Sequence, residues 1–189
     1  MSLPAIRRGV SVSWDQTAAF RRFTEEFGTW WPCRTHSIGG HRVRRVVFEC
    51  RAGGSIYEEH VDGRRFQWGK VIEVDPPRSV KFTWHPSRAA STAQEVEVRF
   101  EIEGSGTRVE LVSDRWENWG KNAHRARRGY DLGWGYLLNT WAGRRTRKMA
   151  LVDCLTVVLR GVEILRGGVR ATIARAGGEI APADGESLR

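Results

Sequence analysis

Apolar and polar residues alternate over much of the chain, and this pattern is typical of β-strands with one buried face. The clearest stretch, residues 95–103, puts four apolar side chains on one face and five charged side chains on the other. Turn signals such as Asp62-Gly63 separate neighbouring runs and predict an antiparallel meander. In the run 66–74, Phe66, Trp68, Ile72 and Val74 are expected to share one face. The predicted strands are residues 6–13, 43–50, 55–61, 66–74, 80–84, 95–103 and 109–113.

Two other stretches repeat with the helical period. Asp15, a good N-cap, precedes three Phe residues at helical spacing, and Gly28 is predicted to end this first helix. A long amphipathic helix is predicted over residues 124–148. A curved antiparallel sheet with a long helix across it gives an α+β fold, and would enclose a cavity between its two layers. The buried face of the long helix carries Tyr130, Trp134, Leu137, Leu138 and Trp141.

Short motifs spread over most of the chain match a known family in their number, order and spacing. They are Phe23-Thr24-Glu25, Trp30-Trp31-Pro32, His36-Ser37-Ile38-Gly39, Gly53-Gly54-Ser55-Ile56-Tyr57-Glu58, Asp62-Gly63-Arg64, Trp68-Gly69-Lys70-Val71, Asp75-Pro76-Pro77-Arg78, Phe82-Thr83-Trp84, Glu95-Val96-Glu97-Val98-Arg99-Phe100, Gly106-Thr107-Arg108-Val109-Glu110-Leu111, Gly129-Tyr130-Asp131 and Gly133-Trp134.

Through these motifs the chain, from about Ile6 to Ala150, resembles the START-like (SRPBCC) superfamily, in its bacterial branch named after the activator of Hsp90 ATPase. The resemblance implies a helix-grip fold: a curved antiparallel sheet of about seven strands wrapped around a long C-terminal helix, with a short N-terminal helical pair. Many such relatives bind apolar small molecules, and some are aromatases or cyclases of polyketides. The eukaryotic co-chaperone has a further N-terminal domain, for which there is no room before Ile6, so Hsp90 regulation is not expected.

The net charge of +9 is only weak evidence for binding of a nucleic acid. The excess lies in residues 1–50 and 114–148, and 27 of the 31 basic residues are Arg, as a GC-rich coding sequence would produce. A solvated basic face is therefore favoured over a nucleic-acid site. With no run of about 18 apolar residues and no apolar signal-peptide core, the chain is expected to be cytoplasmic and without a membrane span.

The nine Trp residues are the main candidates for ligand contact. In a helix-grip fold the apolar face of the sheet is also the wall of the cavity, so core packing and ligand binding are overlapping interpretations. Trp30 and Trp31 are expected in a loop at the cavity mouth, with Trp116 and Trp119 at the opposite lip. The predicted ligand-binding residues are Trp30, Trp31, Tyr57, Trp68, Trp84, Trp116 and Trp134.

Acid–base chemistry would depend on one strand, in which Tyr57 and Glu59 point to one face and Glu58 and His60 to the other. A carboxylate inside an apolar cavity could act as a general acid or base. A solvated strand face is the favoured alternative for these residues. Glu58, Glu59 and His60 are thus catalytic candidates only, and a non-enzymatic protein is favoured over an enzyme.

No metal or cofactor is expected. The spacing of Cys33, His36, His41 and Cys50 matches no standard zinc pattern, and free structural thiols explain the cysteines more simply. Beyond the domain at residues 1–150, residues 151–176 are predicted to form an extra amphipathic helix, a candidate homodimer contact. Residues 177–189 are predicted to be a disordered tail.

Three functions remain open at this stage. Binding of an apolar or aromatic small molecule between sheet and helix is favoured. The first alternative is a cyclase-, aromatase- or hydrolase-like enzyme that uses the same cavity. The second is a protein-interaction or co-chaperone-like regulator, acting through the basic helix or the C-terminal extension.

Overall fold

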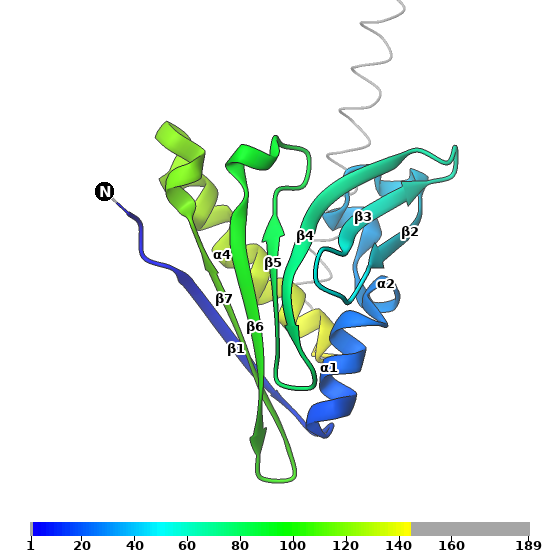
Figure 1. The fold of residues 1–189 in the computed structure, drawn as a ribbon, viewed down its shortest axis with the longest axis vertical. Coiled ribbons are helices and arrows are strands. Elements are labelled where there is room, and N and C mark those ends of the chain that lie inside the picture. Colours follow the sequence, from blue (N-terminus) through cyan, green and yellow to red (C-terminus); the bar gives the residue numbers. More distant parts are fainter. Residues whose placement is uncertain (1, 145–189) are drawn as a thin grey trace, which may run out of the picture. The chain divides into compact units, whose positions relative to one another are not determined.

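The computed structural model describes residues 2–144, which form one seven-stranded antiparallel sheet with helices on its concave side (Figure 1). The strand order is β1-β7-β6-β5-β4-β3-β2, so the first strand pairs with the last. The predicted number of strands and the helix-grip arrangement are confirmed. The strands are β1 (Ile6–Val12), β2 (Val43–Phe48), β3 (Ser55–His60), β4 (Arg65–Asp75), β5 (Ser79–Trp84), β6 (Gln94–Glu103) and β7 (Gly106–Asp114).

The long helix α4 crosses the sheet diagonally and supplies the second layer of the core (Figure 1). Its Trp134 ring lies 5.3 Å from Trp84 of β5, and its Trp141 ring lies 6.5 Å from Phe100 of β6. Large aromatic side chains therefore fill much of the space between the layers. The helices are α1 (Gln16–Thr24), α2 (Phe27–Trp30), α3 (Cys33–His36) and α4 (Ala123–Trp141), with the short 3₁₀ helices η1 (Gly40–Arg42), η2 (Ala90–Thr92) and η3 (Trp116–Asn122).

The first helix begins where the sequence predicts and ends earlier. The Asp15 side chain accepts a hydrogen bond from the backbone N–H of Ala18 at 2.8 Å, which confirms the N-cap. The prediction that Gly28 ends this helix is wrong, because α1 ends at Thr24 and Gly28 lies within α2. A Cβ atom on Gly28 would meet the carbonyl oxygen of Val46 at 2.6 Å, so this glycine lets α2 approach β2 closely.

One face of β4 also differs from the prediction. Ile72 was expected beside Trp68 on the inner face, yet 42% of its surface is exposed, whereas Val71 is 2% exposed. The pairing register of β4 shifts against β3 near Ile56 and against β5 near Val71. Such bulges insert an extra residue and reverse the alternation, so Val71 takes the inward position.

The long helix ends at Trp141 rather than at the predicted Lys148, and residues 145–148 lie outside the described part of the chain. Gly143 has a φ of 70°, and its N–H donates to the carbonyl oxygen of Thr140 at 3.1 Å. The N–H of Arg144 donates to the carbonyl oxygen of Asn139 at 2.8 Å. This pair of bonds is a Schellman motif, in which a left-handed residue stops the helix.

A Gly143→Ala variant is expected to lose about 1 kcal/mol of unfolding free energy, because the left-handed conformation is costly for a residue with a Cβ atom. Gly129→Ala is the matched control, since Gly129 lies inside α4 with open space around it. There alanine should stabilise the protein by about 0.5–1 kcal/mol. Urea denaturation measures both, and two shifts of the same sign would contradict this account of the helix end.

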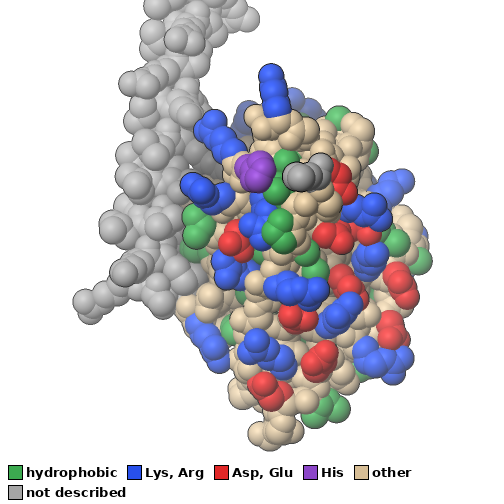
Figure 2. Space-filling view, turned by 90° about the vertical axis from the view of Figure 1, so that its left-hand side faces the viewer, with side chains coloured by type: hydrophobic (Ala, Val, Ile, Leu, Met, Phe, Trp, Pro, Cys, Tyr) green, Lys and Arg blue, Asp and Glu red, His purple; other side chains and the backbone are tan. Residues whose placement is uncertain are grey.

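The surface charges are largely paired on the strands. Arg7 and Glu110 lie 3.8 Å apart between β1 and β7, and Lys81 and Glu95 lie 2.9 Å apart between β5 and β6. Figure 2 shows a face on which side chains of both signs are interspersed over much of the surface. Within residues 2–144, no helix has the length and apolar character needed to cross a membrane. The predicted helix at 151–176 and the predicted tail lie outside the described residues.

Candidate ligand-binding site

Four Trp rings meet between the sheet and α4. The Trp31 ring, just after α2, lies 5.0 Å from that of Trp68 on β4 and 5.5 Å from that of Trp84 on β5. Trp68 and Trp84 are 5.4 Å apart, and Trp84 is 5.3 Å from Trp134 on α4. We call Trp31, Trp68, Trp84 and Trp134 the indole cluster. Each is at most 5% exposed, so the cluster belongs to the core.

A rim of further aromatic groups continues from the indole cluster toward η3. Tyr130 lies 6.5 Å from Trp134 and 5.4 Å from Trp116. Burial raises the pKa of Tyr130 to about 12, so its phenol keeps its proton at neutral pH and can act as a donor. Arg88, in the loop after β5, lies over the Trp119 ring at 3.9 Å and ties that loop to η3.

Four polar atoms near the indole cluster are buried without a hydrogen-bond partner among residues 2–144. They are Nε1 of Trp68, Nε1 of Trp134, Oε1 of Gln94 and Oγ of Ser113. Their side chains are 0–3% exposed. Buried polar atoms in proteins are nearly always paired with protein, water or ligand, so a group of four such atoms requires an explanation.

Strand register puts these residues at one end of the concave face. Trp84 at the end of β5 is directly opposite Gln94 at the start of β6. Ser113 near the end of β7 is opposite Val96, two residues along β6 from Gln94. The N–H of His85, the residue after β5, donates to the carbonyl oxygen of Trp68 at 2.6 Å. Trp68 on β4 is therefore next to the same end of β5. Two indole N–H donors, a carbonyl acceptor and a hydroxyl therefore belong to neighbouring elements.

The structure brings six of the seven residues predicted to bind a ligand into a connected set of ring contacts. Trp31 and Trp116, expected at the lips of a cavity, are instead buried, at 5% and 0% exposure. Trp30 is half-buried, and its ring lies 5.7 Å from that of Trp31. Tyr57 is separate, because it lies on the other face of β3 under the guanidinium of Arg65, which is 5.0 Å from the Tyr57 ring.

The acid–base candidates divide between the two faces of β3. Glu58 and His60 are 0% and 2% exposed, so the favoured interpretation of a solvated face is wrong for them. The Glu58 carboxylate accepts hydrogen bonds from the backbone N–H groups of Ile38 and Gly39, both at 2.7 Å, and lies 2.5 Å from Nε2 of His60. This carboxylate therefore fixes the segment between α3 and η1 against β3.

Glu59 faces the opposite way and has partners of a different kind. Its carboxylate accepts hydrogen bonds from Arg45 at 3.0 Å and from Arg65 at 3.1 Å. The hydrogen bond from Arg45, followed by that from Arg65, holds the pKa of Glu59 below its usual range. Arg45 and Arg65 are more than half exposed, whereas Glu59 itself is 7% exposed, so a buried carboxylate is paired here with two guanidinium groups that reach water.

The lowered pKa of Glu59 predicts an effect of acid on stability. The folded state favours the ionised form, so Glu59 stabilises the protein above its unfolded pKa, and that contribution is lost as the pH falls through the folded value. Glu59→Gln should therefore be less stable than the parent at neutral pH, and the difference should shrink as the pH falls below the ordinary Glu pKa of about 4.3 and vanish once the carboxyl is protonated in the folded state as well. Urea denaturation across pH measures it, with exposed Glu101→Gln as control; a constant difference would contradict it.

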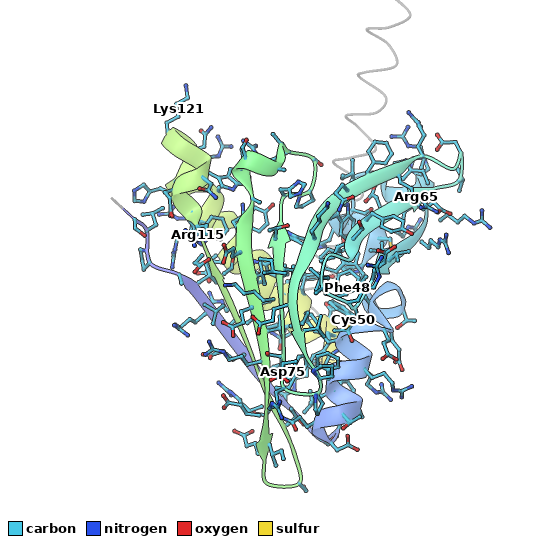
Figure 3. The ribbon with its side chains drawn as sticks, viewed as in Figure 1. Phe48, Cys50, Arg65, Asp75, Arg115 and Lys121 are labelled. Atoms are coloured by element: carbon cyan, nitrogen blue, oxygen red, sulfur yellow. The ribbon has the colours of Figure 1, made fainter. Side chains whose placement is uncertain are left out.

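The cysteines and the remaining histidines do not gather as metal ligands. Within the described residues, no group of three or more His, Cys, Asp or Glu side chains is placed to hold a metal ion. Cys33 and Cys50 are free thiols. Burial, followed by the negative charge of Glu58, raises the pKa of Cys33, and burial raises that of Cys50, which lies near α1 (Figure 3). Both groups thus stay protonated at neutral pH.

Sequence reasoning did not select Gln94 and Ser113 as site residues. The sequence did contain an indication. Each residue takes the next inward-facing position on a strand whose other inward-facing residues are apolar: Gln94 precedes Val96 on β6, and Ser113 follows Leu111 on β7. A polar residue in an inward position is informative, since it must find a partner inside. Tyr130 was placed on the buried face of the long helix but was likewise not proposed as a ligand contact.

The family model described as Activator of Hsp90 ATPase homolog 1-like protein matches residues 16–140, most of the part of the chain that forms this sheet and its helices. The chain belongs to this family. The resemblance read from the sequence motifs is thereby confirmed. No curated protein matches the chain significantly.

Solved structures with the same fold include proteins that are described in different ways. An anthrahydroquino-gamma-pyrone synthase, Txn09, is 29% identical with a TM-score of 0.54, and the match covers 76% of this chain and 98% of that one. The Aha1 dimer from Colwellia psychrerythraea is 12% identical, with a TM-score of 0.52 and coverage of 76% and 100%. A protein from Mesorhizobium loti is 15% identical, with a TM-score of 0.52 and coverage of 74% and 95%. The last two show the fold alone.

Proposed function

We propose that the chain binds an aromatic small molecule carrying hydroxyl or carbonyl oxygens, between the concave face of the sheet and α4. The observation that supports this most is the group of four buried polar atoms on Trp68, Trp134, Gln94 and Ser113, which have no partner among residues 2–144. Each unpaired buried group costs the folded state about 1–3 kcal/mol. A ligand that pairs with them repays that cost on binding.

The hydrogen-bonding character of the four atoms indicates which polar groups the ligand carries. The two indole N–H groups need acceptors, such as carbonyl or phenolic oxygens, and Gln94 Oε1 needs a donor, such as a hydroxyl. The faces and edges of the indole cluster favour a flat aromatic ring over a flexible acyl chain. The 29% identical neighbour supports this choice, since its name places it among enzymes that make an anthrahydroquinone fused to a pyrone.

The competing role in protein interaction has less support. A dimer is described for the Colwellia psychrerythraea relative, which is 12% identical to this chain. The homodimer contact predicted for this chain would use residues 151–176, which lie outside the described part. It therefore remains a prediction, and the argument for a ligand does not depend on it.

The proposal is tested by Trp fluorescence with matched ligands. Alizarin, a dihydroxyanthraquinone, is titrated beside anthraquinone, which has the same rings without hydroxyls, and beside palmitate. We expect alizarin to quench Trp fluorescence with the highest affinity, because only alizarin supplies both donors and acceptors. If no member of a wider panel of hydroxylated aromatics alters the fluorescence, the proposed function is wrong.

Two variants separate ligand recognition from folding. Ser113→Ala and Gln94→Leu remove polar atoms that have no strong partner in the described structure, since the Gln94 Nε2 bond to Thr92 is long at 3.4 Å. They should therefore leave the unfolding free energy equal or higher. Each should nevertheless weaken alizarin binding by about fivefold, the equivalent of one hydrogen bond. Variants that lose stability and keep affinity would contradict this role.

A further inference from the structure

Glu58 and His60 form a fully buried pair on the same concave face as the indole cluster. Both lie on β3, two residues apart, and are 0% and 2% exposed. Glu58 is directly opposite Phe66 on β4, and Trp68 is the next residue of β4 on that face. The pair therefore lies one strand away from the indole cluster.

The surroundings of the pair fix which nitrogen of His60 carries a proton. Glu58 Oε1 is 2.5 Å from Nε2 of His60, and the two Glu58 oxygens already accept the N–H groups of Ile38 and Gly39. When Glu58 is ionised its oxygens can only accept, so Nε2 is then the donor in both the neutral and the charged ring. In the neutral imidazole the other nitrogen, Nδ1, then presents a lone pair.

That second nitrogen is buried and has no hydrogen-bond partner among the described residues. The His60 ring is held between Gly39, whose Cβ position would lie 2.2 Å from Nε2, and the Phe66 ring, 4.3 Å away. The ring thus cannot turn to find another partner without displacing its neighbours. A fixed, buried acceptor without a donor is the counterpart of the unpaired atoms of Trp68 and Gln94.

We propose that His60, positioned by Glu58, takes up the proton of an acidic hydroxyl on the bound aromatic ligand. In this step the O–H bond of a phenol or enol breaks, its electron pair stays on the oxygen, and a new N–H bond forms at Nδ1. The products are a phenolate or enolate and an imidazolium. No oxidant or further reactant is needed. The inference depends on the proposed function, because it requires a ligand at the indole cluster.

The charges near the pair favour this transfer. The Glu58 carboxylate stabilises the imidazolium that forms, as a carboxylate does in other carboxylate–histidine pairs. Two further titratable groups of the described residues interact with the pair: Cys33 on α3 interacts with Glu58, and Asp62 in the turn after β3 interacts with His60. Asp62 is already paired with Arg64 at 2.7 Å, which leaves Glu58 as the partner of the imidazolium. Glu58 is thus a positioning residue and His60 the proton acceptor.

A simpler role is that Glu58 only fixes the Ile38–Gly39 segment, with His60 filling space beside it. The visible spectrum of bound alizarin distinguishes the two roles, because the dye absorbs at longer wavelength once a hydroxyl is ionised. With the full chain, the deprotonation midpoint of bound alizarin should lie about one to two pH units below that of the free dye. His60→Gln should abolish this shift while alizarin still quenches Trp fluorescence.

The control variant is His85→Gln, which alters another buried histidine, one whose Nδ1 lies 3.1 Å from the carbonyl oxygen of Arg88. This variant should keep the shift. A shift that persists in His60→Gln, or alizarin bound to the parent protein without any shift, would overturn the inference and leave the proposed function standing. Absence of alizarin quenching in the parent protein would count against both.

A second measurement does not depend on any variant. In the ¹⁵N spectrum of histidine-labelled protein, the ring of His60 should be in the form protonated at Nε2 and bare at Nδ1. Addition of alizarin should move the Nδ1 resonance to the position of a protonated nitrogen. A ring protonated at Nδ1 before ligand is added, or an Nδ1 resonance that alizarin leaves unchanged, would overturn the assignment of His60 as the acceptor.

Discussion

Replacement of Trp84 by alanine is expected to lower the free energy of unfolding by about 3–5 kcal/mol, the typical cost of removing a large buried aromatic side chain. Trp84 is 3% exposed, and its ring lies within 6 Å of those of Trp31, Trp68, Phe82 and Trp134. Trp84 thus joins β4, β5 and the residue after α2 to α4. Since small domains have a total stability of about 5–15 kcal/mol, the loss would be a large share.

Urea denaturation monitored by far-UV circular dichroism measures this loss. Leu132→Ala is the control, because Leu132 lies on the same helix as Trp134 and is 72% exposed, so its truncation should change stability by less than about 0.5 kcal/mol. Trp84→Phe should give an intermediate value. If Trp84→Ala were as stable as Leu132→Ala, the indole cluster would not be the main contact between the two layers.

Glu58→Ala is expected to cost about 3–5 kcal/mol, for a different reason. The substitution leaves two backbone N–H groups and the Nε2 proton of His60 buried without an acceptor, and each unpaired buried donor costs about 1–3 kcal/mol. The hydrogen bonds from Ile38 and Gly39, both 2.7 Å long, join β3 to the segment before η1, and the 2.5 Å contact with His60 lies within β3. The expected result is a lower urea midpoint with an unchanged slope.

Glu59→Ala supplies the matched comparison, since it removes the same side chain one residue away on the opposite face of β3. The partners of Glu59 are Arg45 and Arg65, whose exposed guanidinium groups water can solvate once the carboxylate is gone. The loss should therefore be clearly smaller than for Glu58→Ala. Equal losses would show that burial of the Glu58 oxygens has little energetic consequence.

The sequence was sufficient to predict the strands of the sheet, because apolar and polar residues alternate regularly along most of them. On β6, Val96, Val98 and Phe100 all point inward as their spacing requires. On β4 the same reasoning failed at Ile72, because a bulge changes the register and a period of two residues cannot reveal where an extra residue is inserted. The early end of α1 has a related cause, since the packing of α2 against β2 is a tertiary effect.

The site was only partly predictable for a similar reason. The Trp residues were evident from composition and alternation. The partners of Glu58, by contrast, are backbone groups about twenty residues earlier in the chain, which carry no side-chain signal in the sequence. Whether Glu58 or Glu59 faces inward depends on how β3 pairs with β2 and β4, and alternation alone leaves both choices open.

The buried polar atoms near the indole cluster connect stability with recognition. A protein selected only for stability would place apolar side chains at Gln94 and Ser113, since neither forms a strong hydrogen bond within the described residues. Retaining polar groups there lowers the stability of the ligand-free protein, as is common at functional sites. An equal or higher stability of Ser113→Ala, together with a loss of affinity, would be the measurable form of this compromise.

The pairing of β1 with β7 has a consequence for biosynthesis. Ile6 is aligned with Ser113 and Val12 with Thr107, so about a hundred residues separate the partners. While the ribosome makes the chain, β1 emerges first but has no neighbour until β7 has left the exit tunnel. Contacts this distant in sequence slow folding and leave the inward-facing Ile6 and Val10 of β1 uncovered in the meantime. Residues 6–12 should therefore remain without their strand partner until the last strand is made.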